Sequence, residues 1–108
     1  MASPATPGAA AAASPASPAR PSTATPVWFD CDPGHDDALA LILAGYSPSL
    51  NLLGISTVAG NQSIEKTTVN ALNVLHVAAL EHLPVYAGRE QPILRKGVQC
   101  PEIHGVSG

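Results

Sequence analysis

The sequence predicts an α/β fold built on an open, mainly parallel β-sheet, and three observations support this. Short runs of strand-forming residues alternate with longer segments of helical periodicity along residues 27–108. Each expected strand is followed by a loop that contains glycine or polar residues. The helices between the strands supply the crossovers that a parallel sheet requires. We therefore expect a βαβαβ order with right-handed crossovers.

Each element has a local reason in the sequence. The expected elements, in chain order, are a strand at 27–29, a helix at 36–44, a strand at 52–58, a helix at 64–81 and a strand at 84–87, followed by a loop to residue 108. Acidic residues at 36 and 37 suit a helix N-terminus, and Ser63 is a suitable N-cap for the second helix. The first helix is apolar on nearly every side, so it should be well buried, and Gly45 and Pro48 should end it.

Residues 1–26 differ in composition from the rest of the chain. They are mostly Ala, Pro, Ser and Thr, with one Arg, no acidic residue and no Val, Ile, Leu or aromatic residue. Such a segment buries too little apolar surface to offset the entropy cost of ordering, so we expect a disordered tail. Without a bulky apolar run it does not resemble a secretory signal, and it supports an organelle transit peptide only weakly. The single expected domain covers residues 27–108.

Charge, hydropathy and cysteine content exclude several classes of partner. The formal net charge is −3 and the five basic residues are scattered, so no nucleic-acid partner is expected. No apolar run approaches the roughly 20 residues of a membrane span, so no membrane contact is expected either. The two cysteines, Cys31 and Cys100, are too few for a disulfide scaffold, which favours reduced thiols and a cytoplasmic location.

Four carboxylates lie within eight residues after the first strand, at Asp30, Asp32, Asp36 and Asp37. Their mutual repulsion requires compensation, either from the positive end of the following helix or from a hard divalent cation such as Ca²⁺ or Mg²⁺. In the alternative interpretation, the last two acids only cap the helix and the first two are solvated. Because parallel strands place their carboxyl ends at one edge, Asn61 and the loop at Gly88 should lie beside these acids.

Other binding motifs fit the sequence less well. An EF-hand requires Gly at the sixth position and Glu at the twelfth, and Leu41 occupies the twelfth when Asp30 is counted as the first. The Cys31-x₃-His35 and Cys100-x₃-His104 spacings do not match structural zinc sites. A nicotinamide-binding loop is excluded because no Gly-x-Gly-x-x-Gly follows the first strand.

The sequence Asp-Cys-Asp-Pro-Gly-His-Asp-Asp-Ala-Leu-Ala at 30–40 resembles the N-terminal signature of the inosine/uridine-preferring nucleoside hydrolase family. Similar motifs recur at 57–61, 84–88 and 103–108, so the likeness covers essentially all of 27–108. The resemblance implies the start of a Rossmann-like sheet and hydrolysis of the N-glycosidic bond of ribonucleosides to free base and ribose. It also implies Ca²⁺ as cofactor and a homo-oligomer when the protein is full length.

The resemblance assigns roles to the aspartates. Asp32 and Asp37 would bind Ca²⁺, and Asp32 would also act as the general base that takes a proton from water. Asp36 would hydrogen-bond the ribose hydroxyls and favour the positively charged transition state. Asp30 would support the site from behind these residues.

Three further residues receive roles from the same resemblance. Asn61 would help to position the water and the sugar, although Gly-Asn after a strand is also a common turn. Ile103 and His104 would border the nucleobase. His104 has a pKa suited to protonating the leaving base, but a residue that only shapes the base pocket is the simpler interpretation.

Members of this family are several-fold longer than the chain, and further calcium ligands would lie beyond Gly108. Two aspartates supply fewer than the roughly six to eight oxygens that Ca²⁺ prefers. We therefore expect a fragment that is poorly stable and inactive by itself, because its third strand is an uncovered edge and its first helix lacks packing partners.

Two alternatives to an active nucleoside hydrolase stay open at this point. The first is a haloacid-dehalogenase-like, Mg²⁺-dependent phosphohydrolase, which also uses Asp-x-Asp after its first strand. That family requires Thr or Val where this chain has Gly34. The second is a non-catalytic truncated variant that associates with a full-length subunit.

Overall fold

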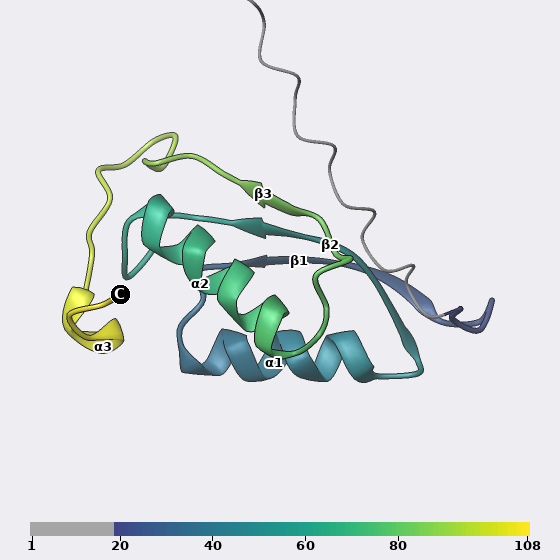
Figure 1. Ribbon diagram of the computed structural model, residues 1–108. Coiled ribbons are helices and arrows are strands. Elements are labelled where there is room, and N and C mark those ends of the chain that lie inside the picture. The colour runs from purple at the N-terminus through teal and green to yellow at the C-terminus, as the bar shows by residue number, and fades with distance from the viewer. Residues whose placement is uncertain (1–18) are drawn as a thin grey trace, which may run out of the picture.

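The computed structural model describes residues 19–108 and contains a three-stranded parallel sheet with the strand order β1-β2-β3 (Figure 1). Its elements, in chain order, are β1 (Thr25–Cys31), α1 (His35–Tyr46), β2 (Leu50–Thr57), α2 (Ile64–Val77), β3 (Val85–Ala87) and α3 (Pro101–His104). The predicted α/β class and the βαβαβ order are confirmed. Within residues 19–108, no helix is both long enough and apolar enough to cross a bilayer.

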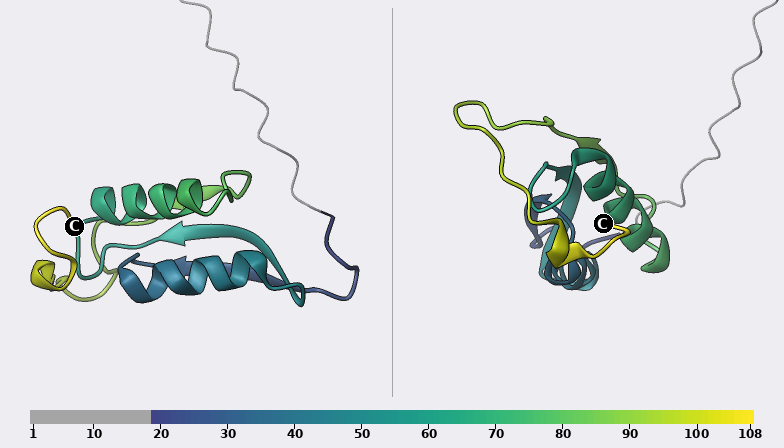
Figure 2. Two further views of the ribbon diagram at one scale, coloured as in Figure 1. Left: turned by 60° about the horizontal axis from the view of Figure 1, so that its bottom comes forward. Right: turned by 90° about the vertical axis from the view of Figure 1, so that its left-hand side faces the viewer.

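Helices α1 and α2 lie on the same face of the sheet. Both contact β2, and they also contact each other, as the end-on view in Figure 2 shows. At the centre, Ile55 of β2 is fully buried between its strand neighbours Phe29 and Val85. Burying a side chain of this size contributes about 1.5–3 kcal/mol. The buried core consists of Cys31, Leu41, Ala44, Leu52, Ile55, Leu75, Leu80 and Leu83.

The opposite face of the sheet presents polar and aromatic side chains. Because side chains alternate along a strand, Trp28 and Asp30 point away from the face that Phe29 occupies. Trp28 Nε1 donates a hydrogen bond to Ser56 Oγ at 3.0 Å, and the Ser56 hydroxyl donates to Asp30. Trp28 also packs against Tyr86, with ring centroids 5.6 Å apart. Asp30, which was predicted to end the first strand, therefore lies within β1.

The N-terminal end of β1 differs from the sequence-based boundary at residue 27, because the strand starts at Thr25. Arg20, still earlier, donates from Nη1 to Leu50 O at 2.9 Å. Its guanidinium also donates to two carbonyls at the C-terminal end of α1, those of Gly45 and Ser47. The boundary inferred from composition thus falls inside β1. Disorder was expected for residues 1–26, and of these 1–18 lie outside the described residues.

The helices also differ from the expectations. Leu39 and Leu43 of α1 are 71% and 73% exposed, so the prediction that this helix is well buried is wrong. The reason is that only the side of α1 that faces β2 and α2 is covered. Gly45 lies inside α1 rather than ending it, and its missing side chain makes room for Leu80. α2 stops at Val77, earlier than residue 81, and the chain then turns through Ala79 with φ 54°.

Candidate functional site

The loops at the carboxyl ends of β1 and β2 bring together three residues that the sequence singled out. Asp32 lies in the turn between the end of β1 and the start of α1. The backbone N–H of Asn61, in the loop after β2, donates to Asp32 Oδ2 at 2.9 Å. The backbone N–H of Asp32 donates in turn to Oδ2 of Asp37, in the first turn of α1, at 3.1 Å. We call Asp32, Asp37 and Asn61 the aspartate cluster.

Gly60 allows the loop after β2 to pass close to Asp32. A Cβ atom built on Gly60 would lie 2.6 Å from Asp32 Cγ and 2.9 Å from Asp32 Cβ, and it would also collide with Oδ2. Gly60 is not among the residues with positive φ, so the need for glycine comes from this close approach and not from the backbone conformation. In the sequence, Gly60 stood out only as part of a Gly-Asn turn and of the motif at 57–61 that resembles the family.

Negative charge accumulates at the aspartate cluster. Partial burial raises the pKa of Asp37 above its ordinary value of 3.8, and the neighbouring Asp36 carboxylate raises it further. The hydrogen bond from the Asp32 N–H acts in the opposite direction, because it stabilises the carboxylate. Asp36 itself is exposed, and its position in the first turn of α1 suits the positive end of the helix. The repulsion among these acids favours a bound cation at the turn.

The aspartate cluster fits part of a site for a hard divalent cation. The hydrogen bonds described above engage Oδ2 of Asp32 and Oδ2 of Asp37 and leave Oδ1 of each carboxylate as a further potential ligand atom. Carboxylate oxygens suit Ca²⁺ or Mg²⁺ better than zinc. In the part of the chain that the structure describes, no three His, Cys, Asp or Glu side chains are grouped to hold a metal ion. The two aspartates would thus provide part of the roughly six to eight oxygens that Ca²⁺ takes.

The C-terminal segment, predicted to be a loop, contains the short helix α3 beyond the carboxyl ends of the strands (Figure 1). The ring of His104 lies against the acidic turn, since a Cβ built on Gly34 would be 2.9 Å from His104 Nε2. His104 is also close enough to Asp37 to lower the pKa of that carboxyl slightly. Its Nδ1 is buried without a hydrogen-bond partner among residues 19–108. Ile103 is 58% exposed, and the contact of both residues with a nucleobase stays a prediction.

Three hydrogen bonds that sequence reasoning missed connect the C-terminal segment and α2 to the site. The backbone N–H of Cys100 donates to Asn61 O at 3.0 Å. Asn70 Nδ2, on α2, donates to Pro33 O at 3.0 Å and to Gly108 O at 2.8 Å. No local sequence pattern predicts these hydrogen bonds, because each joins residues that are far apart along the chain.

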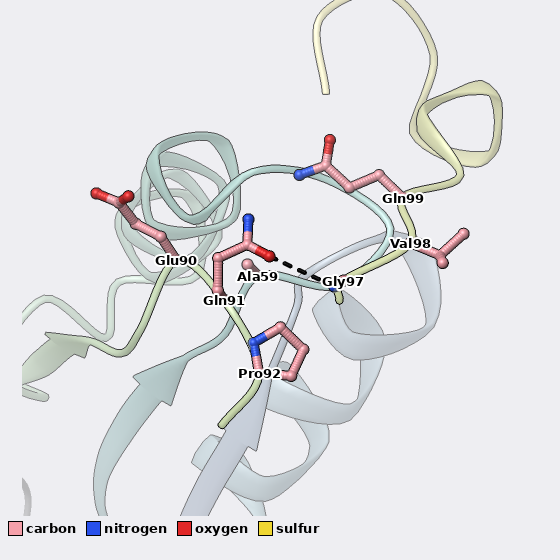
Figure 3. Close-up of a pocket in the computed structure, with 8 residues that line it drawn as sticks. Ala59, Glu90, Gln91, Pro92, Gly97, Val98 and Gln99 are labelled. Carbon is pink, nitrogen blue, oxygen red and sulfur yellow. Dashed lines mark hydrogen bonds between the residues drawn. The ribbon is translucent and has the colours of Figure 1, made fainter. Parts of the chain in front are cut away.

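A cavity of about 390 Å³ adjoins the aspartate cluster through Gly60. One side is formed by Ala59 and Gly60, and the other by 90–92 and 97–99. Figure 3 shows that Gln91 and Gly97, which both line the cavity, are joined by a hydrogen bond from the Gly97 N–H to Gln91 Oε1. At 3.4 Å this bond is long. The lining of the cavity includes carboxylate and amide side chains, which can form hydrogen bonds with a small polar ligand next to Asp32.

Asp30 and Cys31 lie at the end of β1 but point to different sides of the sheet. Asp30 accepts a hydrogen bond from the Ser56 hydroxyl, on the face of the sheet away from the helices, so its supporting role at the site stays a prediction. Burial raises the pKa of the Cys31 thiol to about 12, and the carboxylates of Asp37, Asp30 and Asp32 add to the rise. Cys31 and Cys100 are both free thiols. A thiol with so high a pKa is a poor metal ligand, which agrees with the oxygen-based site.

Fold and site together define a parallel α/β protein with clustered carboxylates at the carboxyl ends of its strands. The family model described as inosine-uridine preferring nucleoside hydrolase matches residues 27–108. The chain belongs to this family.

Named relatives agree with this assignment. Pyrimidine-specific ribonucleoside hydrolase RihB of Escherichia coli strain HS is 52% identical over 79 residues, which cover 73% of this chain and 25% of the relative. Among solved structures, the plant nucleoside hydrolase PpNRh1 is 37% identical with a TM-score of 0.64, over 68% of this chain and 23% of that chain. An inosine-guanosine nucleoside hydrolase is 28% identical with a TM-score of 0.62, over 67% and 22%. The chain thus spans about a quarter of the length of these relatives.

Proposed function

We propose that the whole protein hydrolyses the N-glycosidic bond of ribonucleosides of the inosine or uridine type, and that this chain provides part of the active site. The observation that supports the proposal is the aspartate cluster, which lies at the carboxyl ends of β1 and β2 in a chain of the nucleoside hydrolase family. The names of the relatives, a pyrimidine-specific ribonucleoside hydrolase and an inosine-guanosine nucleoside hydrolase, favour the same substrate class.

In the proposed reaction, Asp32 is the general base. Its carboxylate takes a proton from a water molecule whose oxygen forms a bond to ribose C1′, while the bond from C1′ to the base nitrogen breaks. The electron pair of that bond leaves with the base, which then gains a proton. Asp32 is held for this task by the Asn61 N–H on Oδ2 and by the close approach of Gly60.

Other residues would bind and orient the substrate. Asp36, exposed beside the cluster, would accept hydrogen bonds from the ribose hydroxyls and stabilise the positive charge that develops on the sugar. Asn61 would position the water and the sugar through its side chain, because its backbone N–H is already bonded to Asp32. Ile103 and His104 would border the nucleobase, and the position of His104 beside Gly34 supports this.

We also propose Ca²⁺ as the cofactor, with Asp32 and Asp37 as the ligands from this chain. When bound, the ion would supply a Lewis acid that lowers the pKa of water and aligns it with the sugar. The hard oxygen donors support this choice, and so does the pKa of Asp37, which burial and then repulsion from Asp36 raise in the absence of a cation.

A graft tests the proposal. The residues of this chain that align with E. coli RihB replace their counterparts in that enzyme, and release of base from uridine and inosine is measured with Ca²⁺ and with a chelator. We expect calcium-dependent turnover in the graft. Asp32→Asn in the graft should lose about 10²- to 10⁴-fold in kcat, the usual contribution of a general base. Glu65→Gln, on the exposed first turn of α2, serves as the control. Normal turnover by the Asp32→Asn graft would remove Asp32 from the mechanism.

The haloacid-dehalogenase-like alternative is not favoured, because the family match covers all of 27–108. We further propose a cytoplasmic protein, which the two free thiols support. Self-association of the full-length protein stays a prediction, which light scattering can check.

A further inference from the structure

Asn70 lies in the middle of α2 and has no assigned role. Its Nδ2 donates to Pro33 O at 3.0 Å and to Gly108 O at 2.8 Å. A carboxamide nitrogen has two hydrogens, so these two bonds use its full donor capacity. The two partner atoms, Pro33 O and Gly108 O, only accept hydrogen bonds, so the orientation of the amide is fixed.

Helix α2 itself does not require asparagine at this position. Asparagine favours a helix interior less than alanine does, because its side chain competes for backbone hydrogen bonds. Asn70 and Asn73, one turn apart on α2, both line a surface cavity of about 270 Å³. Asn73 is exposed. Asn70 therefore serves contacts outside its own helix.

The two acceptors belong to segments on either side of the candidate site. Pro33 follows Asp32 directly and is buried, so its carbonyl fixes the path of the turn that bears the aspartate cluster. Gly108 belongs to the segment that begins at α3 with Ile103 and His104. Lys66 on the same helix also reaches this segment, donating to Val106 O, but at 3.4 Å this is a long and weak contact.

We propose that Asn70 is a positioning residue that couples the aspartate turn to the 103–108 segment, so that a cation bound at the turn holds that segment in place. This inference rests on the proposed function, because it takes the aspartate cluster as the cation site and the 103–108 segment as the nucleobase side. It assigns the coupling to one side chain that donates a hydrogen bond to each of the two segments.

The test uses the full 108-residue chain and two measurements on each variant. Calorimetry gives the affinity for Ca²⁺ alone, and hydrogen exchange followed by NMR gives the protection of the amides of 105–108 with and without Ca²⁺. The variants are Asn70→Ala, Asn70→Leu, which keeps a similar volume without donors, and the matched control Asn73→Ala. Circular dichroism selects a temperature at which every variant is folded, so that loss of the fold is not mistaken for loss of coupling.

In the wild-type chain, Ca²⁺ should slow exchange in 105–108. Asn70→Ala and Asn70→Leu should abolish this slowing, speed up exchange without metal by about fivefold, the equivalent of one ordinary hydrogen bond, and weaken Ca²⁺ binding by a similar factor. Asn73→Ala should behave as the wild type does.

Three results would overturn the inference: Ca²⁺ binding without protection of 105–108 in the wild type, unchanged exchange in both Asn70 variants, or equal effects in Asn73→Ala. The failure of the proposed function looks different. In that case the wild type takes up no Ca²⁺, and the metal-free exchange comparison alone decides whether Asn70 holds the two segments together.

Discussion

Replacing Gly60 with alanine tests how the structure holds Asp32. The added Cβ would stand 2.6 Å from Asp32 Cγ and 2.9 Å from Asp32 Cβ, and the obstacle is a short side chain next to the backbone rather than the end of a flexible one. The chain can respond in two ways. Either the loop after β2 moves away, or Asp32 rotates and gives up the hydrogen bond from the Asn61 N–H.

Each response has a cost that can be estimated. Forcing an extra methyl group into a packed position costs about 1–3 kcal/mol. Losing a hydrogen bond to a charged group costs about 1.5–3 kcal/mol, and we take the lower end because Asp32 is half-buried. The chain needs only one of the two responses, so their costs do not add, and we expect the free energy of unfolding to fall by about 2 kcal/mol. Loss of a partner that orients a metal ligand lowers metal affinity by about 10- to 100-fold, and we expect a loss in this range for Ca²⁺.

Thermal unfolding and calcium calorimetry on Gly60→Ala measure the two effects. Gly97→Ala is the control, because the nearest atoms to its Cβ would be Gln91 Oε1, at 3.1 Å on a side chain that can move, and Pro92 Cδ at 3.3 Å, neither as close as the atoms of Asp32 are to a Cβ on Gly60. Gly97→Ala should keep the calcium affinity of the wild type. If Gly60→Ala also keeps its calcium affinity within about twofold of the wild type, the close approach of Gly60 does not position Asp32 and the reasoning fails.

Three further predictions follow from single side chains. Arg20→Ala should lower the free energy of unfolding by about 1–2 kcal/mol in chemical denaturation, because three backbone carbonyls lose a charged donor; an unchanged midpoint would mean that Arg20 does not hold α1 to β2. Asp37→Asn should raise the Tm of the metal-free chain at pH 7 and weaken calcium uptake. The reason is that the pKa of Asp37 is higher in the folded chain than its ordinary value of 3.8, so its contribution to stability falls as the pH rises from 3.8 through the folded-state pKa. Below pH 3.8, where the carboxyl is protonated in both states, the wild type and the variant should have similar Tm values. Cys31, with a pKa of about 12, should resist iodoacetamide in the native chain at pH 8, because only about one thiol in 10⁴ is ionised at that pH. It should react after denaturation, and rapid labelling of the native chain, identified by mass spectrometry, would contradict its burial.

The order of the elements could be predicted from the sequence because periodicity and turn residues are local signals. β3 and the start of α2 at Ile64 agree with the prediction within a residue. The extent to which α1 is buried could not be predicted. The apolar residues of a helix indicate how much of its surface could be buried, but the sequence does not indicate how much of that surface contacts a neighbouring element. The start of β1 was missed for a similar reason. Thr25 and Pro26 have no strand signal of their own and join the sheet by pairing with Leu50 and Asn51.

The site divides in the same way. Asp32, Asp37 and Asn61 could be predicted to meet, because residues after neighbouring parallel strands share an edge and the resemblance to a family reinforced this. Strand alternation also predicts that Asp30 points to the side of the sheet opposite Cys31, provided that the expected first strand is extended through Cys31. The contacts of Gly60 and Asn70 could not, since each depends on the distance between segments in the folded chain.

The face of the sheet opposite the helices has a practical use. Trp28 is the single tryptophan of the chain, it is half exposed, and it rests on Tyr86 across the strands. Its emission therefore reports on that face alone. Any polypeptide that settles there would displace water from the indole and shift its fluorescence to shorter wavelength, so one spectroscopic titration can follow assembly on the bare side of the sheet without a label.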